Sequence, residues 1–322
     1  MDASCDLLYI GRSRLHRSRA NLIQTLQTVA AFADCGLRVR LALPPWSRTA
    51  SPASLMAACG IDRPFEIVAS QLLHPRFRFR PFVAWYRQAL ARIPLIYTRV
   101  VDMALALARA GIACSVEIHN LDALPERGRL AALIAAHRQG RVRLLVPISH
   151  SAGVELVAAG AAAERIHVAP SGFDATAYAR VPVFDAARLA RPRIVHLGRL
   201  SAERGRAVFE AVVATGEADV TIVGGGEEVA GARNVASVPP REVPDWYGAC
   251  DVVLLPYQAS IRTARTMSPI KLFEAMAAGR PIVASDLPTL REVLADGETA
   301  LLAPPDEPGA WLAALARLRS DP

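Results

Sequence analysis

The fold is decided by residues 193–227, which read RIVHLGRLSAERGRAVFEAVVATGEADVTIVGGGE. Residues 193–197 predict a strand, and a helical pattern follows over 205–215. Residues 220–223 return as a second strand, which ends in three glycines. A strand, a helix and a strand in so short a segment are typical of a parallel sheet covered by helices.

The same alternation extends over the rest of the chain. We expect further strands at 7–10, 37–43, 94–97, 113–118, 144–148, 166–169, 251–255 and 281–284, and helices at 20–33, 101–110 and 269–278. Residues 175–192 carry only weak patterning, so we place a domain junction there. The prediction is an α/β protein with two Rossmann-like, doubly wound parallel-sheet domains, residues 1–178 and 179–322, which face each other across a cleft and bind ligands at the strands' carboxyl ends.

Composition excludes several classes of protein. Hydrophobic residues make up 52% of the 322 and charged residues 21%, which is ordinary for a globular protein. No apolar run reaches the roughly 18 residues of a membrane span, and the start of the chain does not resemble a secretion signal. Its five cysteines are scattered without a CxxC pair, which fits a reducing compartment. We expect a cytoplasmic protein, and attachment to the inner face of the membrane stays open.

The charge is carried almost entirely by arginine. The formal net charge is +7, and Lys271 is the only lysine in the chain. An excess of cations favours an anionic partner. The candidates are a nucleotide diphosphate, a membrane surface and a nucleic acid. No RNA- or DNA-binding pattern accompanies the excess, so we expect no nucleic-acid partner.

The segment Ser268 to Glu274 is the most informative for function. Ser268 is a good helix N-cap and Pro269 suits the first helical position, so the free N–H groups there favour a phosphate. Lys271 lies in the first turn, where the helix dipole disfavours a cation unless it meets an anion. Glu274 projects from the same face and can accept hydrogen bonds from a ribose diol. The alternative is a well-capped amphipathic helix with Glu274 on its solvated side.

A second segment follows the predicted strand at 193–197. Arg199 and Arg204 lie across a turn bounded by Gly198 and Gly205, at the strand end where ligands bind. Two arginines so placed can clamp a diphosphate, although surface arginines near a turn would give the same pattern. Residues 224–227 form a flexible strand-end loop without the GxGxxG spacing of a dinucleotide site.

Together these segments resemble the retaining, family-4-type glycosyltransferases of the GT-B fold (glycosyl transferases group 1). The resemblance covers most of the chain and is densest from Ile194 to Pro305. The matching elements are Gly198-Arg-Leu200 with Arg204-Gly205, Val223 to Glu227, Val243 to Pro256, Phe273 to Ser285, and Glu292 to Pro304. Upstream, Ser18 to Gln24, Glu117-Ile-His119, Ile148-Ser149 and Pro170 to Asp174 follow in the family's order.

The resemblance implies roles for matching positions. Arg199 and Arg204 would hold the donor pyrophosphate, Glu274 the ribose hydroxyls, and His119 would face the donor sugar from the other domain. The candidate catalytic residues are thus Arg199, Arg204 and His119, and the candidate donor-binding residues are Gly11, Gly198, Thr266, Met267, Ser268, Pro269, Ile270, Lys271 and Glu274. A lone His after a strand is otherwise more often structural, and the double glycine usual at Gly11 is absent.

Two features depart from the family's pattern. Thr266 stands where the family has a sugar-binding glutamate, which leaves the backbone amides of 266–268 to hold phosphate and sugar. Relatives also continue beyond the position of Pro322 through further helices, so we expect either a short member of the family or a truncated chain.

Residues 74–87 alternate cations with aromatic side chains. This pattern predicts either a membrane-surface or acceptor-binding element, or a solvated helix with its aromatics in the core.

The function that the resemblance implies is transfer of a hexose-like sugar from a UDP- or GDP-sugar donor to an acceptor hydroxyl, with retention at the anomeric carbon. The acceptor would be a glycan, a lipid-linked molecule or a small molecule. We expect no metal or other cofactor, because GT-B enzymes of this kind need none and the chain lacks an Asp-x-Asp motif. The alternative is a catalytically weak nucleotide-sugar-binding subunit of a transferase assembly.

Overall fold

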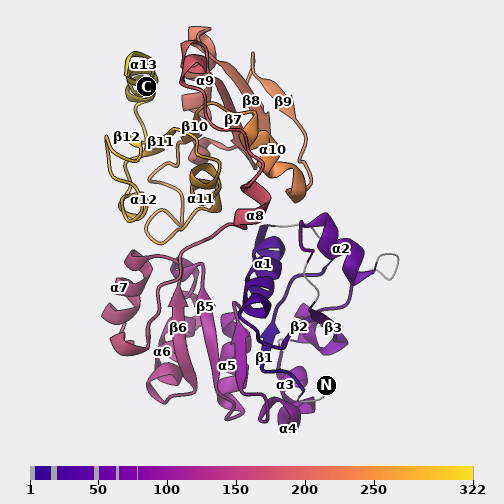
Figure 1. Ribbon diagram of the computed structural model, residues 1–322. Coiled ribbons are helices and arrows are strands. Elements are labelled where there is room, and N and C mark those ends of the chain that lie inside the picture. Colours follow the sequence, from indigo (N-terminus) through magenta and orange to yellow (C-terminus); the bar gives the residue numbers. More distant parts are fainter. Residues whose placement is uncertain (1–3, 16–19, 47–50, 63–64, 78, 322) are drawn as a thin grey trace. The chain divides into compact units, whose positions relative to one another are not determined.

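The computed structural model describes residues 4–15, 20–46, 51–62, 65–77 and 79–321. It divides into two compact units, Met1–Ala169 and Pro170–Pro322 (Figure 1). The division comes before the predicted boundary at residue 178, because Tyr178 packs into the core of the second unit with Tyr247, ring centroids 6.3 Å apart. The predicted family element at Ser18 to Gln24 is described only from Ala20 onward.

The first unit is built on one parallel sheet of six strands in the order β3-β2-β1-β4-β5-β6. This is the strand order of a dinucleotide-binding Rossmann sheet. The strands are β1 (Leu7–Ile10), β2 (Val39–Leu43), β3 (Glu66–Ala69), β4 (Leu95–Thr98), β5 (Cys114–Ile118) and β6 (Val142–Pro147). We predicted all of these except β3.

Helices cover both faces of this sheet because successive strand residues point to opposite sides. Leu7 and Tyr9 of β1 pack in one core with α1, whereas Leu8 and Ile10 pack in the other with α5 and α6. The helices are α1 (Ala20–Asp34), α2 (Pro52–Ala58), α3 (Arg80–Trp85), α4 (Arg87–Leu90), α5 (Val101–Arg109), α6 (Arg129–Arg138) and α7 (His150–Ala158). Short 3-10 turns are η1 (Gln71–Leu73), η2 (Pro75–Phe77), η3 (Leu121–Ala123), η4 (Glu126–Gly128) and η5 (Ala163–Arg165).

The second unit repeats the arrangement. Its strands pair in two parallel groups, β9-β8-β7 and β10-β11-β12, which a parallel bridge between Ile194 and Val252 joins. The combined order β9-β8-β7-β10-β11-β12 matches that of the first unit. The strands are β7 (Arg193–Leu197), β8 (Asp219–Val223), β9 (Arg233–Val235), β10 (Val253–Leu255), β11 (Ile282–Ser285) and β12 (Leu301–Ala303).

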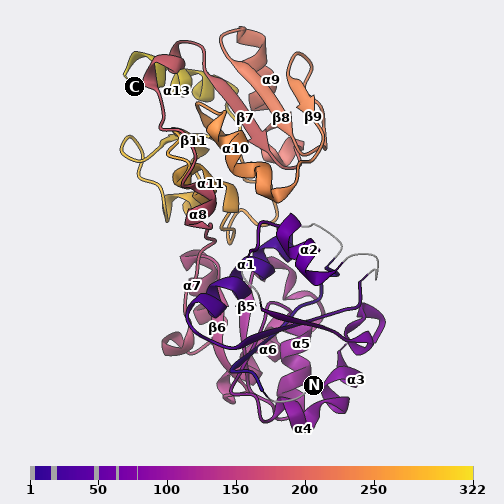
Figure 2. The same ribbon diagram turned by 45° about the vertical axis from the view of Figure 1, so that its right-hand side comes forward.

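Two buried clusters again flank the strands. α9 and α13 pack on one face, and α10 and α11 on the other. Figure 2 shows β7, β8 and β9 side by side, with α9 next to them. The helices are α8 (Ala175–Tyr178), α9 (Arg206–Thr215), α10 (Val243–Gly248), α11 (Ile270–Ala277), α12 (Pro288–Arg291) and α13 (Pro308–Ser320), with 3-10 turns η6 (Ala186–Ala190), η7 (Ala202–Arg204) and η8 (Pro240–Glu242).

One predicted strand is wrong. Residues 166–169 make only an isolated parallel bridge, Ile166 with Leu145, and the backbone bonds His167 N to Leu145 O and Ala169 N to Pro147 O. The segment therefore runs along β6 without a continuous ladder. No helix in the described part of the chain is long and apolar enough to cross a bilayer.

Candidate functional site

The first candidate site lies where β7 ends. Gly198 directly follows this strand with φ 109°, and its N–H donates to Val223 O at 2.6 Å. A Cβ on Gly198 would lie 3.0 Å from Cε and 3.1 Å from Nζ of Lys271. Only glycine accepts this φ readily and also leaves room for the lysine. The structure thus brings two predicted site residues, Gly198 and Lys271, into contact.

Lys271 is a partly buried cation without a carboxylate partner at ion-pair distance among the described residues. Its Nζ lies 3.4 Å from Nε2 of His196. Burial, and then the charge of Arg204, lower the pKa of Lys271 to about 7, although Glu274 opposes the shift. An ammonium held in such surroundings is stabilised by an added anion.

Glu274 is half-buried and hydrogen-bonded to two tyrosines, whereas the alternative interpretation of this helix placed it on a solvated side. The hydroxyl of Tyr247 donates to Oε2 of Glu274 at 3.2 Å, and Tyr178 hydrogen-bonds the same carboxylate. Burial raises the pKa of Glu274, against these two hydrogen bonds and the charge of Lys271. Neither tyrosine could be predicted from the local sequence, because they come from α8 and α10. The role of Glu274 toward a ribose remains a prediction.

The predicted cap of this helix is also wrong. α11 begins at Ile270, its N-cap is Pro269, and no side chain caps it. The Ser268 hydroxyl instead accepts a hydrogen bond from Ser171 N at 2.9 Å, and the Ser171 hydroxyl donates to Ser268 O at 2.6 Å. Ser268 therefore anchors the loop around Ser171, and the first amides of α11, at Ile270 and Lys271, remain without intrahelical partners.

The amides of Thr266 and Met267 are not free to hold a phosphate or sugar as predicted. Both donate to Thr263 O, at 3.0 and 2.8 Å. Both side chains are buried, at 1% and 7% exposure. These two residues therefore stabilise the loop internally. Of the predicted backbone site, the amides of Ser268 and of the first residues of α11 remain as candidates.

The two predicted arginines differ in their setting. Arg204 is half-buried at the end of η7 and acts on the pKa of both Lys271 and His196, whereas Arg199 is exposed beside Gly226. No carboxylate of the described residues pairs with either arginine. The charge of Arg204 therefore acts on Lys271, whereas the side chain of Arg199 is exposed to solvent. Gly205 is required here, because a Cβ would lie 2.3 Å from Pro256 Cβ.

The second candidate site belongs to the first unit. The carboxylate of Glu117, the fourth residue of β5, is close to His119 Nε2 and accepts a hydrogen bond from the Tyr9 hydroxyl at 3.4 Å. Burial alone would raise the pKa of Glu117, but the hydrogen bond from His119 and the charge of Arg99 lower it below its usual value. Gly11, at the end of β1, leaves room for Leu43, whose Cδ2 would lie 2.7 Å from an added Cβ.

The contact with Glu117 determines which His119 nitrogen a substrate can use. An ionised carboxylate only accepts hydrogen bonds, so Nε2 of His119 carries a proton. Burial lowers the pKa of His119, although Glu117 opposes the shift. The lowered pKa favours a neutral ring, with a lone pair on Nδ1. No described residue hydrogen-bonds Nδ1, and the side chain is 17% exposed. Nδ1 is thus available to accept a proton or a hydrogen bond from a hydroxyl group.

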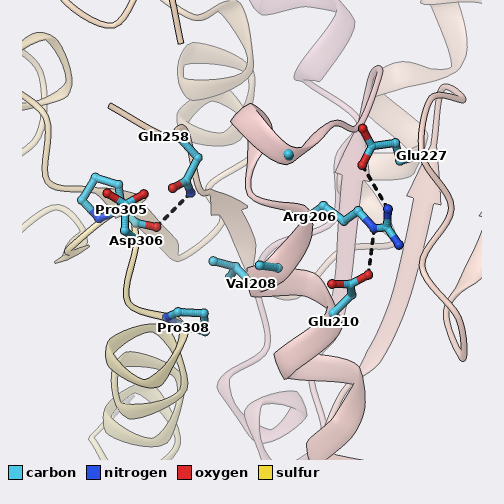
Figure 3. Close-up of a pocket in the computed structure, with 10 residues that line it drawn as sticks. Arg206, Val208, Glu210, Glu227, Gln258, Pro305, Asp306 and Pro308 are labelled. Atoms are coloured by element: carbon cyan, nitrogen blue, oxygen red, sulfur yellow. Dashed lines mark hydrogen bonds and ion pairs between the residues drawn. The ribbon is translucent and has the colours of Figure 1, made fainter. Parts of the chain in front are cut away.

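A separate cavity of about 370 Å³ lies between the start of α9 and the start of α13 (Figure 3). None of the predicted site residues lines it. Arg206, its only cation, is bound by Glu210 at 2.7 Å and Glu227 at 3.2 Å, as the dashed lines in Figure 3 show. Arg204 and Lys271, by contrast, have no carboxylate at ion-pair distance among the described residues. Within the described residues, no group of three His, Cys, Asp or Glu forms a candidate metal site.

The aromatic segment at 74–87 divides between its two interpretations. Phe79 and Phe82 are buried in the core, as expected for a structural role, whereas Trp85 is 77% exposed. Arg78 lies outside the described residues.

Residues 191–321 match the family model described as glycosyl transferases group 1. Over 168 residues the chain is 32% identical to the phosphatidyl-myo-inositol mannosyltransferase of Mycolicibacterium smegmatis, covering 47% of this chain and 42% of that protein. Over 287 residues it is 26% identical to the D-inositol 3-phosphate glycosyltransferase of Nocardia farcinica, covering 78% and 59%. The chain thus spans only about half the length of these curated relatives.

Solved structures resemble nearly the whole chain. HepE of Anabaena in complex with UDP and glucose superposes with a TM-score of 0.72 at 16% identity, over 98% of this chain and 90% of HepE. The sucrose-phosphate synthase of Thermosynechococcus elongatus gives 0.71 at 17% identity with the same coverage. At such identities the likeness concerns the fold, which is the predicted pair of Rossmann-like units.

Proposed function

We propose that this chain, which belongs to the group 1 glycosyltransferases and has their GT-B fold, transfers a sugar from a nucleoside diphosphate to an acceptor hydroxyl with retention of anomeric configuration. The observation that carries the proposal is the pair of cations at the end of β7. Arg204 is near enough for its charge to lower the pKa of Lys271, and neither cation has a carboxylate at ion-pair distance among the described residues. Elsewhere in the same unit, Arg193 and Arg206 have acidic partners. Unpaired, partly buried cations at a strand end favour a dianionic ligand.

Each site residue has a proposed role in the reaction. As the glycosidic bond breaks, negative charge grows on the leaving diphosphate, and Arg204 and Lys271 stabilise it, with Arg199 contributing from the rim. The diphosphate oxygen takes the acceptor's proton on the face from which it leaves, so that configuration is retained. Glu274 binds the ribose, and Nδ1 of His119 accepts a hydrogen bond from a donor sugar hydroxyl. Gly11 and Gly198 allow close approach of the backbone.

The donor is proposed to be a UDP-sugar, with a GDP-sugar as the alternative. HepE was solved with UDP and with UDP-glucose, and another related structure, TarM of S. aureus, was solved with UDP. The acceptor is proposed to carry a hydroxyl on an inositol, lipid-linked or glycan scaffold, since the curated relatives act on phosphatidyl-myo-inositol and D-inositol 3-phosphate. The exposed Trp85 is the proposed contact for a membrane-bound acceptor.

The proposal is tested first by donor binding. A panel of UDP-, GDP- and dTDP-sugars is screened by thermal shift, because a ligand at 100 times its Kd stabilises the folded state by about 2.7 kcal/mol. One base class should raise the Tm of the wild type, and Arg204→Ala should lose the effect. A wild-type Tm that no member of the panel raises would contradict the proposal. For a bound donor, NMR of the transferred sugar then distinguishes retention from inversion.

A catalytically weak donor-binding subunit is the second candidate. Two observations at Thr266 favour this candidate. Thr266 stands where the resemblance expects a glutamate, so there is no acid for the donor sugar at that position. Its backbone N–H already donates a hydrogen bond to Thr263 O. Calorimetric binding of a donor without hydrolysis or transfer, over a range of inositol and glycan acceptors, would favour it over the enzyme.

A further inference from the structure

His196 is a polar residue buried within strand β7. It is only 4% exposed, and its ring packs edge-on against Phe209 of α9, with centroids 5.1 Å apart. A buried polar side chain requires hydrogen-bond partners. His196 has one such partner, because its Nε2 lies 3.4 Å from Nζ of Lys271. The backbone of Arg199 and Gly198 also influences the pKa of the ring.

These surroundings determine the state of the ring. Burial, and then the charge of Lys271, hold the pKa of His196 well below its usual value, so the ring is neutral. A neutral imidazole has one donor and one acceptor nitrogen, and an ammonium has only donors. Nε2 is therefore the acceptor and Lys271 the donor. This contact directs the lysine head group across Gly198 at the strand end.

We infer that His196 is a positioning residue for the phosphates of the donor, which orients Lys271 toward them and makes their binding coincide with uptake of a proton by Lys271. The inference rests on the proposed function, and it adds a residue that no comparison assigns. The proton comes from solvent, and no covalent bond is made or broken.

The groups around Lys271 account for the uptake. Arg204 repels a proton there, and Glu274, which attracts one, is itself hydrogen-bonded to Tyr178 and Tyr247. His196 supplies an acceptor but no negative charge. In the free protein Lys271 is thus easily deprotonated. Phosphate oxygens next to Nζ add the missing negative charge and raise its affinity for the proton.

The first experiment observes the proton directly. Because Lys271 is the only lysine, 13C-lysine labelling gives a single side-chain NMR signal from the folded chain. The free protein should titrate near pH 7, and saturation with UDP should move the midpoint upward by at least about one pH unit. A free-protein midpoint near that of ordinary lysine, about 10.4, would overturn the inference.

The second experiment separates positioning from structural support. UDP affinity is measured by calorimetry between about pH 7 and pH 9, above the phosphate's own pKa of about 6. Wild-type affinity should fall by up to roughly tenfold per pH unit, the limit for uptake of one proton. Lys271→Arg, which stays charged, should flatten this profile. His196→Phe keeps the ring but removes the acceptor, and should weaken UDP binding about tenfold at the lower pH.

Two further variants complete the design. His196→Gln keeps an acceptor and should restore most of the UDP affinity. His137→Phe replaces another fully buried histidine, whose Nδ1 bonds Val142 O in the other unit, and should leave the UDP profile unchanged. A folded His196→Phe protein with wild-type UDP affinity and pH profile would overturn the inference, whatever its Tm. Absence of UDP binding to the wild type at every pH would instead contradict the proposed use of a UDP donor.

Discussion

His119 and His196 each lie near the carboxyl end of a parallel strand, β5 in the first unit and β7 in the second, but they have opposite partners. The Nε2 of His119 meets the carboxylate of Glu117, and the Nε2 of His196 meets the amine of Lys271. Burial lowers the pKa of both rings; Glu117 opposes this at His119, and Lys271 adds to it at His196. The same side chain thus has an acidic partner in one unit and a cationic partner in the other.

The largest effect is expected when the positive charge of Arg204, near Lys271 in the second unit, is removed. Arg204→Ala should lower the rate of sugar transfer by about 10²–10³, because a preorganised charge opposite the leaving diphosphate is lost. Steady-state kinetics with saturating donor measure it. The matched control is Arg206→Ala, since Arg206 is already neutralised by Glu210 and Glu227. Equal losses in the two variants would contradict the assignment of Arg204.

The next effect concerns Glu274, the acid between the two tyrosines. Glu274→Gln keeps the shape but removes the charge, and each charge-assisted hydrogen bond to the ribose contributes about 1.5–3 kcal/mol. Donor affinity should fall about 10- to 100-fold, measured by calorimetry with UDP. Tyr247→Phe, which removes only the hydroxyl that donates to Oε2 at 3.2 Å, should cost less. Unchanged UDP affinity in Glu274→Gln would indicate that the carboxylate serves only the tyrosines.

A smaller effect tests the acidic partner of His119. Glu117→Gln lets the imidazole adopt either tautomer, so a fraction of the rings lose the lone pair on Nδ1. We expect kcat to fall about tenfold, with little change in UDP affinity. The fall in kcat must be compared with the change in UDP affinity and with the amount of folded protein. A variant whose first unit is merely unstable would lose activity and folded protein together.

The last effect is on stability. Folded Lys271 has a pKa of about 7, whereas the unfolded lysine titrates near 10.4, so the unfolded state binds more protons between these values. The free energy of unfolding should therefore rise with pH in this window, relative to Lys271→Met, by at most about 1.4 kcal/mol per pH unit. Chemical denaturation of both proteins at pH 7, 8 and 9 gives the difference. Parallel curves would place the folded pKa near its ordinary value.

Local sequence pattern predicted most of the elements that position the sites. The strands at 7–10 and 193–197 have the predicted bounds, because short segments rich in apolar residues and closed by glycine leave few alternatives. β3, β9 and β12 were missed: each is short, and two of the three residues of β9 are exposed. Their pairing depends on a neighbouring strand rather than on their own pattern.

Within the candidate sites, the limit of prediction lies at contacts between distant segments. Lys271 and Glu274 could be placed on one helix face from their spacing alone. The hydrogen bond from Tyr247 to Glu274 could not be predicted, because Tyr247 reaches the carboxylate from another helix. The predicted N-cap at Ser268 was wrong for the same reason. Its hydroxyl accepts a hydrogen bond from the backbone N–H of Ser171, 97 positions away, and does not cap the helix.

The sequence by itself determined the two Rossmann-like halves, the single lysine and the glycines that admit close backbone approach, since these follow from periodicity and residue type. Only the tertiary structure decided the partners of His119 and His196. A histidine is neutral or charged, donor or acceptor, according to the burial and charges that surround it. Those surroundings are assembled from segments that the order of the sequence does not bring together.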